Sequence, residues 1–213
     1  MLNDAIMYRL RTVFEFHEHT VAISQLEGWL SDIQGYTLMV LAEQGPGLGA
    51  IVEIGSFKGK STCWLAKGAM RACREKVYAI DSFTGSPEHQ KGMENEDHDI
   101  VNSGSTLEAF KRNTSFLGVA DHVETIVAKS EDAAAAWNKP IRLLFIDADH
   151  SYEASKRDFD LWSPHVIQGG LIAFHDIGAW EGVTDFYNQE VKSNPDYREL
   201  LNVMGLVVVE RIV

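Results

Sequence analysis

The sequence predicts a three-layer α/β fold, in which helices cover both faces of a mostly parallel sheet that contains one reversed strand near the C-terminus. First, short apolar runs alternate with segments of helical periodicity from residue 50 onward, as in repeated strand–helix–strand units. Second, the runs at 50–54, 141–147 and 170–176 are mostly apolar, which is typical of strands buried on both faces. Third, the runs at 198–203 and 206–212 are joined by only two residues, which forces an antiparallel pair.

We expect residues 1–49 to form an N-terminal helical cap and residues 50–213 to form the main part of a single structural domain. Apolar residues recur at helical spacing over residues 2–19, and a second helix is expected to start near Ser31. Glycines and a proline between residues 44 and 49 end that helix. His17 and His19 do not share a helical face, so we expect them to face solvent rather than to bind a metal.

The remaining elements follow in alternation. We expect strands at 76–81 and 123–127, and helices from about residue 61 and over 106–117, 131–137, 153–162 and 180–191. Pro164 stops the helix that ends at residue 162. The stretch 82–105 shows no periodicity, so we expect it to form an irregular lid over a binding pocket.

The composition excludes some classes of partner. The formal net charge is -12, which disfavours nucleic-acid and anionic membrane surfaces, because both attract clustered Lys and Arg. No apolar run is long enough to cross a bilayer. The only cysteines, Cys63 and Cys73, are expected to lie too far apart on one helix to pair. Two reduced, structural cysteines indicate a cytoplasmic protein.

One glycine-containing turn is the strongest candidate for a ligand site. Residues 53–61 read EIGSFKGKS, an apolar strand followed by a turn and the start of a helix. Free N–H groups at a helix start suit a carboxylate or a phosphate. A dinucleotide fingerprint would need glycine where Phe57 stands, and a phosphate-binding P-loop would need one more residue between Gly55 and Gly59. A tight turn without a ligand remains the alternative.

Acids or histidines follow four successive apolar strands. Asp81 ends one strand, residues 130–132 follow the next, and residues 147–150 and 175–176 follow the last two. Ligands of parallel α/β sheets bind outside the carboxyl ends of the strands. An acid in the position of Asp81 can accept hydrogen bonds from both ribose hydroxyls of a nucleoside. This pattern therefore predicts a binding site at that edge of the sheet.

From about residue 28 to residue 213 the chain resembles the class I methyltransferases, which depend on S-adenosylmethionine (SAM). The residues that carry the resemblance are 53–61 (EIGSFKGKS), 147–153 (DADHSYE) and 169–176 (GGLIAFHD), with Asp81 between the first two. The chain is most similar to a small-molecule O-methyltransferase-like branch that includes macrocin-type and cephalosporin-cluster enzymes, and more distantly to caffeoyl-CoA O-methyltransferases. The resemblance implies a Rossmann-like sheet of seven strands whose last strand is reversed.

The resemblance also implies which residues bind SAM. Ser61 and nearby N–H groups would hold the methionine carboxylate, Asp81 the ribose, and Asp147 the methionine amine or a metal. Ser82 and Phe83 would flank the adenosine. The complete set that we expect at the cofactor consists of Glu53, Gly55, Ser56, Phe57, Gly59, Ser61, Asp81, Ser82, Phe83, Ser130, Glu131, Asp147, Asp149 and His150.

The implied reaction is methylation of a hydroxyl on a small molecule such as a sugar or a natural product. Asp147, His150 and His175 are the candidate catalytic residues. In one mechanism Asp147, His175 and Asp176 hold a divalent metal (Mg²⁺ or Mn²⁺) that lowers the pKa of the acceptor hydroxyl. The relatives that use a metal commonly have an acid where His175 stands, and a nitrogen ligand suits Mn²⁺ or Zn²⁺ better than Mg²⁺. In the other mechanism His150 or His175 is the general base.

Two other functions stay open on the sequence. An NAD-type Rossmann oxidoreductase would also use Asp81 for the ribose, although Phe57 stands where a dinucleotide fingerprint needs a glycine. A methyltransferase-like binding protein without turnover would keep the same strand-end residues. We expect a small-molecule acceptor as partner, no nucleic acid and no membrane, and a homo-oligomer could form through the N-terminal helices.

Overall fold

The computed structural model describes residues 4–147 and 149–213 and contains a seven-stranded sheet with the order β3-β2-β1-β4-β5-β7-β6. β1 pairs in parallel with β2 and β4, whereas β7 runs antiparallel to both β5 and β6. The predicted α/β fold with one reversed strand in the C-terminal hairpin is therefore confirmed. The strands are β1 (Ala50–Ile54), β2 (Val77–Asp81), β3 (Val123–Val127), β4 (Ile141–Ile146), β5 (Val166–Phe174), β6 (Tyr197–Val203) and β7 (Leu206–Arg211).

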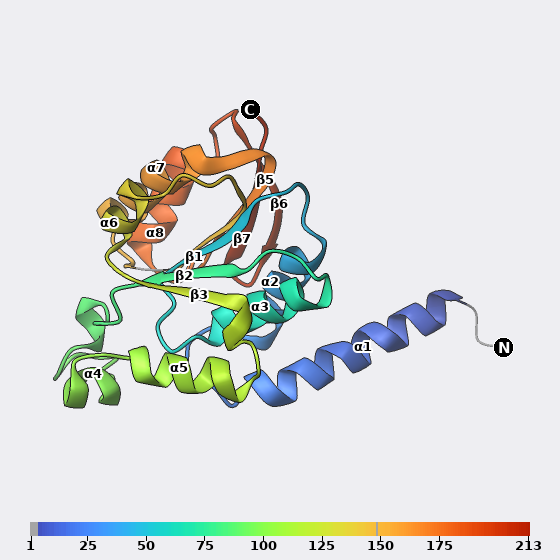
Figure 1. Ribbon diagram of the computed structural model, residues 1–213. Coiled ribbons are helices and arrows are strands. Elements are labelled where there is room, and N and C mark those ends of the chain that lie inside the picture. The colour runs from blue at the N-terminus through green and yellow to red at the C-terminus, as the bar shows by residue number, and fades with distance from the viewer. Residues whose placement is uncertain (1–3, 148) are drawn as a thin grey trace.

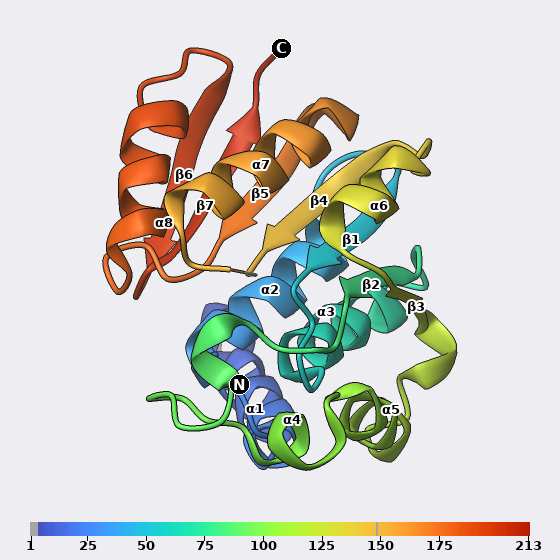
Figure 2. The same cartoon turned by 90° about the vertical axis from the view of Figure 1, so that its left-hand side faces the viewer.

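Helices cover both faces of the sheet, as Figure 1 shows. One face carries α1 (Asp4–Ile23), α2 (Asp32–Gln44), α3 (Lys60–Arg71) and α5 (Leu107–Phe116). The other face carries α6 (Ser130–Ala135), α7 (Tyr152–Trp162) and α8 (Glu181–Phe186), which one π-helical segment (Tyr187–Val191) continues. The view in Figure 2, turned by 90°, separates the two layers. Short helices also occur at α4 (His98–Ser103) and in the 3₁₀ turns Pro87–His89, Ala120–His122 and Ser163–His165.

Alternating side chains of each central strand build two cores. Ile51 of β1 belongs to the core beneath α2 and α3, whereas Val52 and Ile54 belong to the core beneath α6 and α7. All three side chains are almost completely buried, as the period of two in a strand covered on both faces requires. The uniformly apolar runs of the sequence thus become the centre of the molecule.

The sheet fixes the positions of several site residues directly. The strand order changes direction between β1 and β4, which creates a crevice at their carboxyl ends. There the ladder continues one residue beyond the strands: Gly55 N–H donates to Ile80 O (3.0 Å), Asp147 N–H to Ile54 O (2.9 Å) and His175 N–H to Ile146 O (3.2 Å). Backbone hydrogen bonds therefore hold Gly55, Asp147 and His175 at neighbouring strand ends.

A buried arginine fastens the N-terminal part of the chain to the sheet. Arg142 of β4 is 0% exposed, and its Nε lies 3.0 Å from Glu75 Oε2. Its guanidinium also donates to the carbonyls of Leu41 and Ala42 at the end of α2. A cation at a helix C-terminus satisfies free carbonyls and opposes the negative end of the helix dipole. The division of the chain at residue 49 stays a prediction.

Some expected elements differ from the observed ones. The stretch 82–105 is not wholly irregular, because it contains the 3₁₀ turn Pro87–His89 and helix α4. His19 is half-buried and packs its ring 6.4 Å from that of Trp64, so the expectation that it faces solvent was wrong. Residues 2–3 of the first expected helix lie outside the described residues. Among the helices that the structure describes, none combines the length and the apolar character needed to cross a bilayer.

Candidate active site

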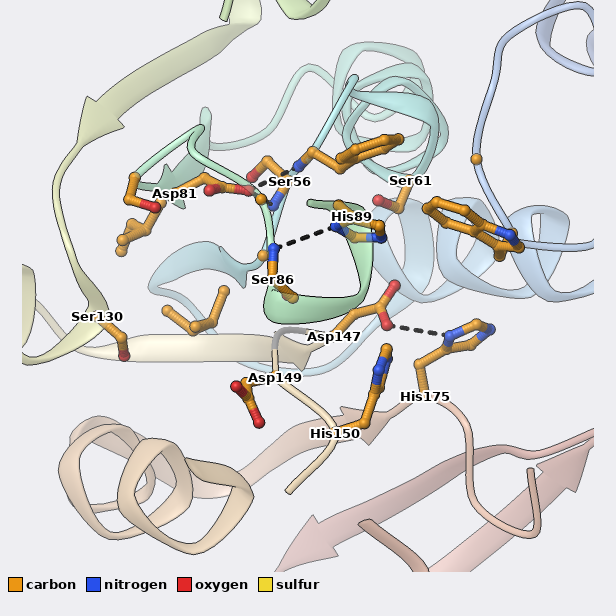
Figure 3. A pocket seen from close by; sticks show the side chains of 18 of the residues that line it. Ser56, Ser61, Asp81, Ser86, His89, Ser130, Asp147, Asp149, His150 and His175 are labelled. Atoms are coloured by element: carbon orange, nitrogen blue, oxygen red, sulfur yellow. Dashed lines mark hydrogen bonds and ion pairs between the residues drawn. The ribbon is translucent and has the colours of Figure 1, made fainter. Parts of the chain in front are cut away.

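A cavity of about 670 Å³ lies at the carboxyl ends of β1, β2 and β4 (Figure 3). The turn after β1 and the ends of β2 and β4 form its base. Residues 27–30 of the N-terminal segment and residues 84–89 of the expected lid form further walls. The segment after β5 closes another side with His175, Asp176 and Trp180. Its volume lies within the range typical of small-molecule sites.

A buried carboxyl group stabilises the glycine turn after β1 through hydrogen bonds. Glu53 is 0% exposed and accepts hydrogen bonds from Ser56 Oγ (2.9 Å) and from Thr62 Oγ1. Burial raises the pKa of Glu53 to about 7, although the hydroxyl hydrogen bonds act in the opposite direction. Gly55 and Gly59 have φ of +88° and +84°, a left-handed conformation that favours glycine. Glu53 therefore supports the turn and does not line the cavity.

Asp81 lies at the centre of a backbone hydrogen-bond cluster. Its Oδ2 accepts the N–H groups of Ser56 (2.8 Å) and Phe57 (2.7 Å), and its Oδ1 accepts the N–H of Phe83 (2.6 Å). These bonds join the end of β2 to the turn after β1 and to the start of the lid. Asp81 also lines the cavity, as its predicted contact with a ribose requires.

The far end of the cavity carries hydroxyl and carboxylate groups. Ser82 Oγ lies 2.8 Å from Thr84 Oγ1, and Ser130 Oγ accepts a hydrogen bond from Trp162 Nε1 (2.9 Å). Glu131 lines the same end. The Phe83 side chain, in contrast, is 0% exposed and packs on Phe110 with ring centroids 5.1 Å apart, outside the cavity.

A histidine between two carboxylates occupies the ends of β4 and β5. His175 Nδ1 lies 3.1 Å from Asp147 Oδ1 and 3.3 Å from Asp176 Oδ1. Burial alone would lower the pKa of His175, but Asp147 and then Asp176 raise it to about 10. Burial would raise the pKa of Asp176, but hydrogen bonds from His150 and His175 hold it well below its usual range. Asp176 has φ of +62°, an uncommon conformation for a residue other than glycine.

His150 lies beside this cluster, between the carboxylates of Asp176 and Glu88. Its Nε2 is 3.1 Å from Asp176 Oδ2, and its Nδ1 is 3.0 Å from Glu88 Oε1, an ion pair without the alignment of a hydrogen bond. Burial lowers the pKa of His150, but the bond to Asp176 and the nearby carboxylates raise it overall. Its ring stacks on Trp180, with centroids 4.5 Å apart and planes at 10°. Asp149, also in the cavity wall, accepts the Ser151 N–H (2.8 Å) where α7 begins.

An aromatic wall completes the cavity, and the sequence indicated only one of its members. Trp29 stacks on His89 with ring centroids 5.0 Å apart, and Phe57 lies 5.2 Å from Trp29 and 5.1 Å from His89. His89 Nδ1 accepts the N–H of Ser86 (3.1 Å), and burial lowers the pKa of His89. These three residues come from the N-terminal segment, the glycine turn and the lid. No spacing in the sequence predicts that they meet.

Most of the expected site residues meet in this one cavity. Three do not line it: Glu53 lies beneath the turn, Gly59 packs against Phe110, and Phe83 faces away. The expected residues in its wall are Gly55, Ser56, Phe57, Ser61, Asp81, Ser82, Ser130, Glu131, Asp147, Asp149, His150, His175 and Asp176.

Three of these residues have a geometry that suits a divalent metal. One ligand atom from each of Asp147, His175 and Asp176 lies within 4.8 Å of the other two. Neighbouring ligand atoms around an octahedral ion at about 2.1 Å lie about 3 Å apart. The distances of 3.1 Å and 3.3 Å from His175 Nδ1 to the two carboxylates are close to this value. Two oxygens and one nitrogen match Mn²⁺ better than Mg²⁺.

A family model described as a methyltransferase domain matches residues 52–177, more than half of the chain. The chain belongs to this methyltransferase family. The match begins within β1 and covers β2, β3, β4 and β5. It therefore includes the glycine turn, Asp81 and the Asp147–His175–Asp176 cluster. The resemblance to class I SAM-dependent methyltransferases that the sequence motifs indicated is thereby confirmed.

Solved structures share the fold of this methyltransferase. The O-methyltransferase NovP is 20% identical, with a TM-score of 0.65, over 85% of this chain and 79% of that chain. An O-methyltransferase from Bacillus cereus in complex with S-adenosylhomocysteine (SAH) is 18% identical, with a TM-score of 0.60. The match covers 94% of this chain and 91% of that chain. TomG, an O-methyltransferase from Streptomyces achromogenes in complex with SAM, is 16% identical, with a TM-score of 0.59. The match covers 100% of this chain and 92% of that chain.

Proposed function

We propose that this protein transfers the methyl group of SAM to a hydroxyl oxygen of a small molecule. The observation that carries the proposal is the continuity of the cavity: it joins the glycine turn and Asp81 to the cluster of Asp147, His150, His175 and Asp176. A cofactor end and a reactive end thus share one space. The O-methyltransferases of similar fold support oxygen as the acceptor atom.

In this proposal the glycine turn and the ends of β2 and β3 hold the cofactor. Ser56 and Ser61 bind the amino-acid part, where the N-terminus of α3 offers N–H groups to a carboxylate. Ser130 and Glu131 lie at the adenine end. Bound there, SAM supplies a methyl group that its sulfonium already activates, so the protein has to align the acceptor and remove a proton.

Asp81 binds the ribose with the acceptor capacity that its backbone contacts leave. A carboxylate offers about four acceptor positions, and three N–H groups already point at Asp81. One ribose hydroxyl therefore finds a free position. The second hydroxyl displaces an N–H of Ser56 or Phe57, so we expect the glycine turn to shift when the cofactor binds.

The acceptor binds between two aromatic stacks. Trp29 with His89 forms one wall of the cavity, and His150 with Trp180 forms another. Flat apolar surfaces of this kind contact the C–H faces of a sugar or the ring of a natural product. The carboxylates of Glu88 and Asp149 in the same cavity favour an acceptor that is neutral or cationic.

In this proposal the Asp147–His175–Asp176 cluster acidifies the acceptor hydroxyl, whose proton passes to solvent, and no free histidine base removes it. Both ring nitrogens of His150 face carboxylates, and His175 Nε2 is buried without a hydrogen-bond partner. A hydroxyl therefore reaches a ring nitrogen of His150 only if the acceptor displaces Glu88, and burial keeps the unpaired Nε2 of His175 from solvent. A divalent metal held by Asp147, His175 and Asp176 would lower the pKa of the acceptor hydroxyl.

The test is a transfer assay with methyl-labelled SAM and a panel of small hydroxyl compounds that includes sugars and phenols, with NAD binding measured in parallel. We expect S-adenosylhomocysteine to form together with a labelled acceptor. Binding of NAD instead of SAM would favour the oxidoreductase. Binding of SAM without transfer to any acceptor would favour a binding protein without turnover. The cytoplasmic location and the lack of a nucleic-acid partner stay predictions from the composition.

A further inference from the structure

Helix α1 presents two different faces. In its second half one face packs on the body of the protein: Phe16 contacts Tyr36 with ring centroids 5.3 Å apart, Glu15 Oε1 lies 3.4 Å from an Arg71 guanidinium nitrogen, and Ile23 is 0% exposed. The first half reaches away from the sheet and the other helices, as Figure 1 shows. The contacts of α1 with its own chain thus concern mainly its C-terminal turns.

The opposite face of α1 carries an exposed apolar stripe. Met7, Phe14 and Val21 recur every seven residues and are 37%, 70% and 56% exposed. Leu10 (42%) and Val13 (64%) lie between them on the same side. Residues at these spacings form one stripe along a helix, interrupted here by the exposed His17, and are usually covered by another element. We name Met7, Leu10, Val13, Phe14 and Val21 the α1 stripe.

We propose that the α1 stripe pairs with the same stripe of a second copy of this chain, antiparallel, about a two-fold axis near Phe14. A two-fold interface requires a self-complementary surface. With the axis at Phe14, the two Phe14 rings meet at the centre. Met7 then lies opposite Val21 of the partner subunit, seven residues away on either side. The exposed His17, on the same side of α1, comes opposite Arg11 of the partner subunit.

The charges that flank the stripe favour this direction of pairing. Arg11 and Glu18 are both exposed, lie on the same edge of the stripe, and stand on opposite sides of Phe14. Neither has an ion-pair partner among residues 4–147 and 149–213. An antiparallel pair brings Arg11 beside Glu18 of the partner subunit, and the symmetry repeats this contact. In a parallel pair Glu18 would instead face Val13 of the partner subunit, and no ion pair would form.

A second copy fits the stripe better than a membrane surface. A helix that lies on an anionic bilayer usually has a basic polar face, whereas α1 carries Asp4, Glu15 and Glu18 against Arg9 and Arg11. The net charge of -12 further disfavours that surface. A helix of 20 residues is about 30 Å long. Because one helix pair is a small interface, the dimer is expected to dissociate on dilution.

Sedimentation equilibrium of the full chain tests the pairing without any assumption about activity. We expect the mass to rise with concentration from 23.8 kDa toward twice that value. Phe14→Glu should keep the protein monomeric. Tyr8→Glu is the matched control, because Tyr8 is also an exposed aromatic residue (73%) but lies on the other side of α1. A wild-type protein that stays monomeric, or equal effects of the two variants, would overturn the proposal.

A charge exchange tests the direction of pairing. Arg11→Glu should raise the dissociation constant of the dimer by about threefold or more, because the symmetry places the new carboxylate beside Glu18 of the partner subunit at two points of the interface. Adding Glu18→Arg to that variant should restore the wild-type dissociation constant. A double variant no better than the single one contradicts the antiparallel arrangement. A monomer whose α1 stripe binds phospholipid vesicles would show that a membrane is the occupant instead. Circular dichroism of each variant verifies that the fold is intact.

Discussion

The ammonium of Lys58 lies 2.7 Å from the carboxylate of Asp97, which joins the glycine turn to the lid. Asp99 lies 2.8 Å from the same nitrogen, and Glu27 of the N-terminal segment also contacts it. Lys58 is only 3% exposed, so these ion pairs are weakly screened. A single side chain therefore connects the glycine turn, the N-terminal segment and the lid, which are distant in sequence.

Replacing Lys58 should loosen the lid and destabilise the fold. In Lys58→Met, the Asp97 carboxylate stays nearly buried without its cation. We expect the free energy of unfolding to fall by about 2–3 kcal/mol. This is less than the loss from breaking a fully buried ion pair, because Glu27 and Asp99 are more exposed than Lys58. Urea unfolding measures this loss, and SAM affinity should fall as well. Lys111→Met, at an exposed ion pair with Glu108, should leave the free energy of unfolding almost unchanged. Similar losses in both variants would contradict the structural role of Lys58.

Gly59 is required by conformation and by packing rather than by contact with the cofactor. A Cβ at Gly59 would lie 2.9 Å from Phe110 Cδ2, and φ is +84°. Gly59→Ala should therefore lower the free energy of unfolding by about 2 kcal/mol or more. Gly118→Ala tests the conformational part alone, because Gly118 has φ of +66° with nothing within 4 Å of the added Cβ. We expect Gly118→Ala to lower the free energy of unfolding by about 1 kcal/mol. Equal losses would remove the argument from close packing.

Glu53 predicts a dependence of stability on pH. Its pKa is about 7 in the folded protein against 4.5 for the free side chain, because the site is buried. Between these values the unfolded chain releases the Glu53 proton while the folded protein keeps it, so this residue makes stability fall as pH rises and adds no further change above pH 7.

The Glu53→Gln variant isolates this contribution. Its unfolding free energy relative to the wild type should increase from pH 4.5 to pH 7, by at most roughly 3 kcal/mol, and then level off. Thermal or urea unfolding across that range gives the difference. A difference that does not vary with pH would mean that Glu53 ionises normally in the folded protein.

Removal of divalent metal should abolish methyl transfer. Protein dialysed against a chelator is expected to regain activity with Mn²⁺ and less well with Mg²⁺, because one of the three ligands is a nitrogen. Asp176→Asn should raise the Mn²⁺ concentration required by at least about tenfold, and calorimetry should report the same loss in Mn²⁺ binding. Glu181→Gln, a nearby acid outside the cluster, serves as the control. Full activity in the presence of strong chelator would instead support a histidine base.

The sequence predicted the parts of this structure that depend on local pattern. Ile51 and Val52 lie in a short apolar run bounded by glycines, which is typical of a strand covered on both faces. The link at Met204 and Gly205 is too short for anything except a hairpin. Because parallel strands end at one edge, Asp81, Asp147 and His175 could be expected to meet there.

Other parts depend on how distant segments fold back on each other. Trp29 and His89 stack only because the N-terminal segment and the lid close on the glycine turn. Phe83 was expected at the adenosine, but its positive φ of +57° turns the side chain toward Phe110. Helix α4 did have a local signal: Asp97 caps it through the N–H groups of Asp99 and Ile100. Its six residues are too few to show a period.

The central claim is that SAM binds across the strand ends with its ribose at Asp81, and titration calorimetry tests it most directly. We predict that the wild-type protein binds SAM, that Asp81→Ala weakens the binding by about 10- to 100-fold through the loss of charged hydrogen bonds, and that Asp132→Ala, at an exposed acid outside the cavity, leaves it unchanged. Equal SAM affinity of the wild type and Asp81→Ala would contradict the account.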